Sequence, residues 1–338
     1  MDLNTIWFLL VGVLFIGYAI LDGFDLGVGI LHLFTKGEER RRVNMNAIGP
    51  VWDGNEVWLL TGGGALFAAF PVVYATVFSG FYLALMLLLF ALILRAVSFE
   101  FRGKVDSRSW RVAWDWAFGL GSLISALLFG VAFGNILRGV PVDATGAYTG
   151  DFLGLLNPYS VLIGLLSVAL FIMHGAIYLD MKTEGDHRDW ASRIVNRLWP
   201  VVVGLYILAT IATFFEAGFL FEGVPGNPIF WVLIVLLFGS ILGIPFLVKS
   251  GKYFAGFIAS STTIASMIGL AALSLFPRLV PSRTDLAYSL TIYNSSSTPR
   301  TLRAMLVIAL VGMPIVIAYT IFVYRIFRGK VTISHESY

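Results

Sequence analysis

The chain has 338 residues, of which 58% are hydrophobic and 13% are charged. Soluble domains are about 25% charged, so this composition excludes a soluble two-domain protein and indicates a helical protein that crosses a membrane several times. The sequence contains no cysteine, which excludes disulfides and thiolate metal ligands. The formal net charge is +3, but the positions of the basic residues argue against nucleic-acid binding.

Nine segments are long and apolar enough to span a bilayer, for which a helix needs about 20 residues. They are 6–33, 52–75, 78–99, 114–137, 158–180, 199–219, 229–248, 254–276 and 303–325. The first is too long for the apolar part of a signal peptide and has no basic flank, so we expect it to remain as a mature helix. No linker separates domains, and we expect a single integral-membrane domain over 1–338.

The basic residues alternate between the two sides of the expected spans. Seventeen of the 23 lysines and arginines lie at 36–42, 100–111, 181–197, 249–252 and 324–330. Five lie in the other connections, and Arg95 lies within the third span. Basic loops stay in the cytoplasm. The pattern therefore predicts an N-terminus outside, a C-terminus in the cytoplasm and an odd number of spans.

A break after the fourth span divides the chain into halves of about 1–137 and 158–276, with a ninth helix left over at about 303–325. Each half begins with a helix that runs from outside to inside, so the halves are candidates for parallel repeats. The sequence support is limited to glycine and apolar patterning near the inner ends of the first and fifth spans.

Acidic residues lie inside segments that otherwise carry almost no charge. The first span contains Asp22 and Asp25, the second begins with Asp53 and Glu56, and Asp115 begins the fourth. A carboxylate near the bilayer centre costs about 2.5–3.5 kcal/mol on insertion scales, so acids retained there are candidates for handling protons or ions. The directions of the helices place all five in the cytoplasmic half, and the i, i+3 spacing puts each pair on one helix face.

Clustered carboxylates in a low-dielectric environment repel one another and are costly to ionise. Such acids can take protons from the cytoplasm and pass them on. The alternative is that they pair with Arg95, with the backbone or with water. For Asp53, Glu56 and Asp115, a position at a helix N-terminus would stabilise the anion without any further function.

His32 and His174 lie near the inner ends of the first and fifth spans and could ligate haem iron. No methionine or cysteine partner pattern accompanies them, so we expect interfacial or hydrogen-bonding roles, with no haem and no metal bound by this chain. The sequence contains no P-loop, dinucleotide fingerprint or HExxH motif, which leaves ATP-driven and zinc chemistry without support.

Several stretches of the chain resemble subunit II of the cytochrome bd-type quinol oxidases. The resemblance runs through the first 183 residues and continues more loosely through 275–282 and the ninth span. The motifs that carry it are GYAILDGFDLGVGIL (17–31), NAIGPVWDGNEVWLLTGGGALFAAFPVVYA (46–75), FSGFYLALMLL (78–88), WDW (114–116), GVAFGNILRGVP (130–141), LLNPYSVLIGLLS (155–167) and MHGAIYLDMKT (173–183).

The resemblance implies an all-α polytopic membrane protein with nine transmembrane helices, arranged as two four-helix bundles plus one peripheral helix. It implies a larger partner, subunit I, that carries two b-type haems, haem d and the quinol site. A small accessory subunit and a structural quinone or lipid are compatible with it. The complex would oxidise quinol and reduce oxygen to water in a bacterial or archaeal cell membrane, taking protons from the cytoplasm and adding to the proton motive force. The isolated chain would not be catalytic.

The resemblance also implies roles for particular residues. Asp25 in DGFD and Asp53 in WDGNEVW match acids proposed to line the family's proton path toward haem d, so Asp22, Asp25, Asp53 and Glu56 form the expected path. Trp58 matches a tryptophan near a proposed oxygen entrance. Glu56 departs from the family form DGNQVW and adds a titratable group. The outside loop after the sixth span is shorter than in other members.

Two other functions remain open from the residues alone. A proton-coupled secondary transporter also uses intramembrane acids and glycine-rich helices. Against it, no pair of helices broken by glycine or proline marks a substrate site, and the acids lie near one surface. The third reading is a purely structural subunit that shields haems from lipid. Oxidase activity of acid-to-amide variants distinguishes the proton path from this structural role.

Overall fold

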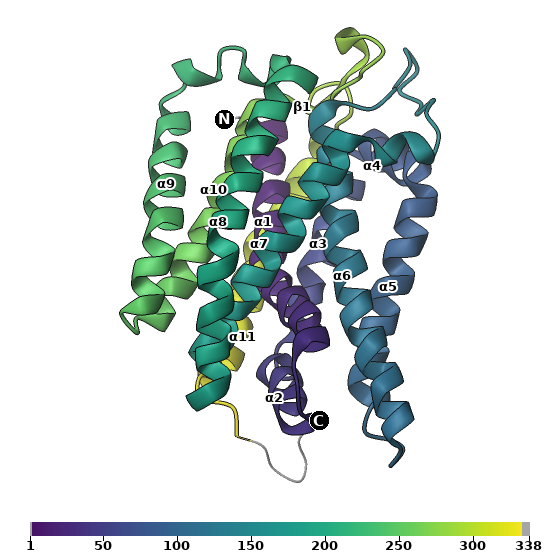
Figure 1. The fold of residues 1–338 in the computed structure, drawn as a ribbon. Coiled ribbons are helices and arrows are strands. Elements are labelled where there is room, and N and C mark those ends of the chain that lie inside the picture. The colour runs from purple at the N-terminus through teal and green to yellow at the C-terminus, as the bar shows by residue number, and fades with distance from the viewer. Residues whose placement is uncertain (1, 333–338) are drawn as a thin grey trace.

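The computed structural model describes residues 2–332 and consists mainly of α-helices that run side by side in one bundle (Figure 1). In chain order the helices are α1 (Leu3–Phe34), α2 (Glu38–Ile48), α3 (Trp52–Ala69), α4 (Pro71–Gly80), α5 (Tyr82–Phe101), α6 (Arg108–Arg138), α7 (Pro158–Lys182), α8 (Gly185–Glu216), α9 (Pro228–Lys249), α10 (Tyr253–Leu275) and α11 (Pro299–Ile326). The strands β1 (Arg278–Val280) and β2 (Leu290–Thr291) form a short antiparallel pair. Short 3-10 turns occur at Leu153–Leu156, Gly218–Phe221, Val224–Gly226 and Leu286–Tyr288.

The bundle has two chemically different ends. At one end, which we call the basic end, lie α2 and the connections 102–107, 183–184 and 250–252. At the other, which we call the loop end, lie the longer connections 139–157, 217–227 and 276–298. Helix α1 begins at the loop end, and α11 finishes at the basic end (Figure 1). The basic segments of the sequence thus gather at one end of the bundle, as their alternation predicts.

Four of the helices that begin at the loop end are started by capping side chains, whereas α5 has no such cap. The caps of α1, α7, α9 and α11 each accept a hydrogen bond from a backbone amide in the first turn, and they are Asp2, Asn157, Asn227 and Thr298. Proline follows the cap in α7, α9 and α11. Proline suits this position because its missing N–H would have no partner within the helix.

Among the described residues, eight helices are long and apolar enough to cross a membrane, namely α1, α5, α6, α7, α8, α9, α10 and α11. Their outward faces carry large apolar side chains, as in α11, where Ile308 is 71% and Leu310 is 67% exposed. Apolar residues exposed on this scale are unfavourable in water and favourable against lipid. The prediction of an all-α polytopic membrane protein is confirmed.

The expected second span, 52–75, is not a single helix. Helix α3 ends before Phe70, whose φ of −133° and ψ of 66° are not helical, and Pro71 begins α4. The proline ring disfavours the helical conformation in the preceding residue. At the basic end, helices extend further than expected, since α6 begins at Arg108 and α8 at Gly185, and the basic connection after α1 forms α2.

Helices α1 and α7 cross with their backbones in contact. A Cβ atom added at Gly27 would lie 1.9 Å from the carbonyl oxygen of Phe171, and one added at Gly175 would lie 2.6 Å from the backbone nitrogen of Val28. Small residues allow this approach, which supplies the close packing that holds helices together in lipid. The crossing fixes the rotation of α1, and therefore which of its side chains face α3.

Candidate functional site

A buried arginine on α5 holds two acids together. Arg95 has no exposed surface, and its guanidinium binds Asp22 of α1 through Nη2 to Oδ1 at 2.7 Å and Nη1 to Oδ2 at 3.2 Å. Nη1 also donates to Oε1 of Glu56 on α3 at 2.9 Å. Charge-assisted pairing of this kind offsets the cost of removing each charge from water. One cation thus joins α1, α3 and α5.

Asp25 lies one turn after Asp22 on α1 but is held by a neutral side chain. It is fully buried and accepts a hydrogen bond from Nδ2 of Asn55 at 2.7 Å. Its other oxygen, Oδ1, has no hydrogen-bond partner in the described part of the chain. Asn55 also donates to the carbonyl of Leu21 at 3.2 Å and accepts from the Tyr324 hydroxyl of α11 at 3.0 Å. An amide N–H can donate to a carboxylate or to the carbonyl oxygen of a carboxylic acid.

Asp53 and Glu56 lie in different environments, although their i, i+3 spacing predicts one helix face. The side chain of Glu56 is 25% exposed and is bound to Arg95, whereas Asp53 is exposed in the first turn of α3. Trp58 is half-buried and packs on α1, where a Cβ added at Gly17 would lie 2.3 Å from its indole ring. Glu56 and Trp58 therefore contact the bundle, and Asp53 faces outward.

Asp115 belongs to a second ion cluster at the basic end. The expectation that it begins the fourth span is wrong, because α6 starts at Arg108 and places Asp115 well inside the helix. Its Oδ1 accepts from Nε of Arg102 at 2.6 Å and contacts Nε2 of His32 at 2.6 Å, and its Oδ2 accepts from Nη1 of Arg41 at 2.7 Å. Asp115 therefore joins α1, α2 and α6, and no cap is involved.

The two histidines of the first and fifth spans form bonds within the protein. His174 is fully buried, with Nδ1 at 2.7 Å from the Ser260 hydroxyl and Nε2 at 3.0 Å from the carbonyl oxygen of Ile20. His32 binds Asp115. Within residues 2–332, no group of three or more His, Cys, Asp or Glu side chains is placed to hold a metal ion. The geometry of these rings fits helix-to-helix bridging.

The sequence analysis did not predict two neutral side chains that are hydrogen-bonded to Asp25 or to its partner, namely Asn55 and Tyr324. Asn55 lies between Asp53 and Glu56 in DGNE, and a polar side chain in that turn was a usable signal. Tyr324 lies 269 residues further along the chain. A tyrosine near the end of a span is ordinarily interpreted as an interfacial anchor, so no local pattern connects it with Asn55.

Comparison with known proteins gives full-length matches. The family described as cytochrome bd terminal oxidase subunit II matches residues 3–327. The chain is 39% identical over 363 residues to the cytochrome bd-I ubiquinol oxidase subunit 2 of Escherichia coli K12, covering 98% of this chain and 95% of that protein. It is 40% identical over 340 residues to the cytochrome bd ubiquinol oxidase subunit 2 of Bacillus subtilis 168, covering 99% and 98%. A probable cytochrome oxidase subunit 2 of Haemophilus influenzae is 40% identical over 359 residues, covering 97% and 95%.

A solved structure shares the fold. The bd oxidase from Geobacillus thermodenitrificans contains a chain that matches with a TM-score of 0.81 at 18% identity, covering 97% of this chain and 99% of that one. At this identity the likeness bears on the fold alone. The family match and the relatives at 39–40% identity cover nearly the whole sequence. The chain therefore belongs to the cytochrome bd terminal oxidase subunit II family, whose members are subunits of an oxidoreductase complex in bacterial membranes.

Proposed function

We propose that this chain is a haem-free subunit of a quinol:oxygen oxidoreductase, and that its acids deliver cytoplasmic protons to subunit I. The observation that carries the proton role is the environment of Asp25. It is fully buried, receives a hydrogen bond from the amide of Asn55, and has one oxygen without a partner among the described residues. A buried charge without a counter-ion costs several kcal/mol, so an acid in this position is suited to hold and release a proton.

The proposal includes nine membrane crossings, with α3 and α4 together as the second. The basic end would face the cytoplasm, because that is where positively charged segments are retained. The halves 1–137 and 158–276 would each contribute a four-helix bundle, and α11 would be the peripheral ninth helix. The contact between α1 and α7 supports this arrangement, since the first helices of the two halves meet there through Gly27 and Gly175.

The proton path would begin at Asp53, which is exposed in the first turn of α3. The next acid, Glu56, is one turn further along and 25% exposed, and Asp25 is fully buried. Exposure falls along this order, as a route from the cytoplasm into the protein requires. Asp22 would act differently, because the guanidinium of Arg95, which donates two hydrogen bonds to it, balances the charge of its carboxylate. Its part would be to hold the arginine beside Glu56.

The outer face of α3 would be covered by subunit I. Asp53 is exposed there, Leu60 is 74% exposed, and Cβ atoms added at Gly63 or Gly64 would meet nothing within 4 Å. An acid is costly against lipid, and bare glycines suit close contact with another helix. Both features support subunit I as the cover of this face. Trp58 lies on the same helix, and we place the oxygen entrance beside it.

The redox cofactors would belong to the partner. In the family that this chain belongs to, two b-type haems and haem d carry electrons from quinol to oxygen when bound in subunit I. The bonds of His32 and His174 to protein groups support this division. This chain would shield the haem-bearing subunit and supply protons from one side of the membrane, adding to the proton motive force of aerobic respiration. A structural quinone or lipid and a small accessory subunit are compatible with these roles.

Oxygen consumption by the purified complex at saturating quinol tests the proposal. Asp25→Asn keeps the shape of the side chain and its contact with Asn55 but removes the exchangeable proton. We expect turnover to fall about tenfold or more at unchanged haem content, since a positioned proton-transfer group contributes about 10²–10⁴ in rate. Asp189→Asn is the matched control, because Asp189 is exposed and its ion pair is with Arg188, outside the acid cluster. Wild-type turnover in Asp25→Asn, or loss of haem from the complex, would instead assign Asp25 a structural role.

A further inference from the structure

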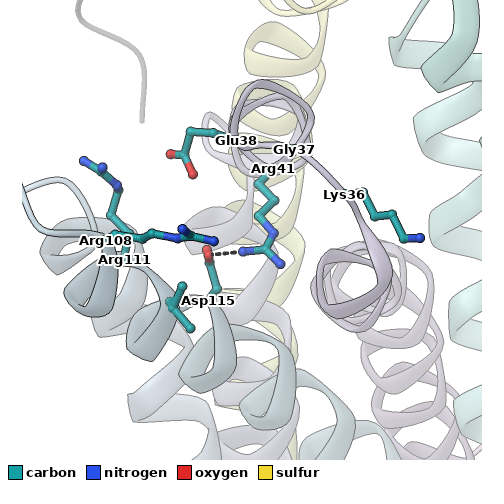
Figure 2. Close-up of a pocket in the computed structure, with 8 residues that line it drawn as sticks. Lys36, Gly37, Glu38, Arg41, Arg108, Arg111 and Asp115 are labelled. Carbon is teal, nitrogen blue, oxygen red and sulfur yellow. Dashed lines mark hydrogen bonds and ion pairs between the residues drawn. The ribbon is translucent and has the colours of Figure 1, made fainter.

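A pocket opens at the basic end of the bundle, between the connection from α1 to α2 and the start of α6 (Figure 2). It has a volume of about 560 Å³. Sites for small ligands fall in the range of roughly 300–1,000 Å³, so this pocket can hold more than a single ion. None of the acids of the proposed path lines it. Its charged lining consists of Lys36, Glu38, Arg41, Arg108, Arg111 and Asp115.

The two acids of the pocket are already matched by cations. Glu38 accepts from Nη2 of Arg102 at 2.9 Å. Asp115 binds Arg102, Arg41 and His32. Arg41 is therefore occupied inside the pocket, as the dashed line between Arg41 and Asp115 in Figure 2 shows. Positive charge remains in the pocket after these pairs are formed.

That positive charge comes mainly from the first turn of α6. Arg108 forms no ion pair within the described residues, and Arg111 pairs with Asp106, whose side chain is 98% exposed. A pair this exposed contributes about 0–1 kcal/mol and exchanges readily for another anion. The Lys36 side chain points away from Asp115 in Figure 2. Arg108 and Arg111 are thus the two cations available to a ligand.

One apolar side chain lines the pocket, and other apolar side chains lie near its lining residues in the sequence. Val112 lines the pocket and is 37% exposed, and Phe34 at the end of α1 is 67% exposed. Along α6, Trp110 lies between the two arginines, Trp114 follows them, and Trp116 is 54% exposed. Tryptophans gather at the level of lipid headgroups. A free anion would use only the arginines, whereas an amphiphile would also use these apolar side chains.

We propose that this pocket binds the phosphate-bearing headgroup of an anionic phospholipid, with Arg108 and Arg111 as its principal ligands. A guanidinium matches phosphate oxygens with two parallel hydrogen bonds, and basic pockets between transmembrane helices bind anionic headgroups. The acyl chains run along the exposed apolar side chains beside Val112 and Phe34. The bound headgroup links α6 to the connection that leads into α2. This site does not depend on the proton path, and only the choice of the cytoplasmic leaflet rests on the proposed orientation.

Lipid binding to the purified two-subunit complex tests the site. Native mass spectrometry with added phosphatidylglycerol measures its affinity, and phosphatidylcholine is the comparison without net charge. Arg108→Gln/Arg111→Gln should weaken phosphatidylglycerol binding about 30-fold, because each basic residue near anionic lipid contributes a factor of about five. Lys249→Gln/Lys252→Gln removes the same charge from the same end and should leave the affinity unchanged. Quinol oxidase turnover should be unchanged in both variants, since neither touches the proposed path.

Three results would overturn the assignment. The first is equal phosphatidylglycerol affinity in the wild type and the arginine variant, and the second is an equal loss in the lysine control. The third is complete displacement of phosphatidylglycerol by millimolar inorganic phosphate, which would identify a site for a soluble anion. Arg108→Lys/Arg111→Lys separates a local effect from misfolding, because it keeps the charge and should restore part of the affinity.

Discussion

Replacement of Arg95 by glutamine should leave Asp22 buried in an apolar bundle without its cation. The side chains of Arg95 and Asp22 are both 0% exposed, and their two hydrogen bonds are 2.7 and 3.2 Å long. Removal of one partner of a buried ion pair costs about 3–5 kcal/mol, because the remaining charge has no compensation. Glu56 is 25% exposed and can turn toward water, so we assign the loss to Asp22. We expect Arg95→Gln to lower the free energy of unfolding by about 3–5 kcal/mol.

The assay is the fraction of intact complex that survives graded additions of SDS to mixed micelles. Arg95→Gln/Asp22→Asn leaves two neutral amides in place of the ions and should recover most of the loss. Arg111→Gln is the matched control, because its partner Asp106 is 98% exposed and such pairs contribute about 0–1 kcal/mol. Equal stability of Arg95→Gln and Arg111→Gln would refute the reasoning, as would a double variant no more stable than Arg95→Gln.

Three further predictions follow from the geometry. Gly27→Ala should prevent assembly of the complex, because its Cβ would lie 1.9 Å from a backbone oxygen of α7. Gly12→Ala on the same helix meets nothing within 4 Å and should assemble. The chromatographic yields of the two complexes are compared, and equal yields would contradict the close crossing of α1 and α7. Glu56→Gln should shift the pH optimum of turnover with maximal activity retained within several-fold, and superimposable pH–rate profiles would remove Glu56 from the path. The pKa of Asp143 lies below its ordinary 3.8, because the hydroxyl and backbone amide of Thr145 and the amide of Ala147 donate to its carboxylate. The connection 139–157 should therefore keep its amide protection above about pH 4 and lose it as the pH falls through the lower, folded-state pKa. Hydrogen exchange measures this, and increasing protection in acid would contradict it.

The helices of the bundle could be predicted from sequence because lipid leaves few alternatives. A backbone in hydrocarbon must satisfy its own hydrogen bonds, so about 20 apolar residues predict a helix with little ambiguity. The break at Phe70 and Pro71 could have been predicted, because proline disfavours the helical conformation in the residue before it. Hydropathy averaged over a span does not detect such a break. The polar turns before Trp114 in α6 carry no apolar signal, and neither does α2. Hydropathy therefore could not locate the ends of these helices.

The candidate site could be located from sequence, and Arg95 was named as an alternative partner of its acids, but which acids it binds could not be predicted. An acid in an apolar span is conspicuous, and Asp22 and Asp25 were identified in this way. The i, i+3 spacing gives the face of a helix, yet it does not identify the helix opposite. The partners Arg95 of Asp22 and Tyr324 of Asn55 lie 73 and 269 residues away. Such contacts depend on how the helices pack, which cannot be deduced from a single sequence.

The central claim is that protons reach the partner subunit through Asp25. The most direct test is proton uptake during a single turnover with oxygen, followed by a pH-indicator dye on the side of the membrane that faces the basic end. In Asp25→Asn we predict that uptake slows about tenfold or more, while oxygen binding keeps its wild-type rate. Wild-type uptake in an Asp25→Asn complex with its full haem content would contradict the claim.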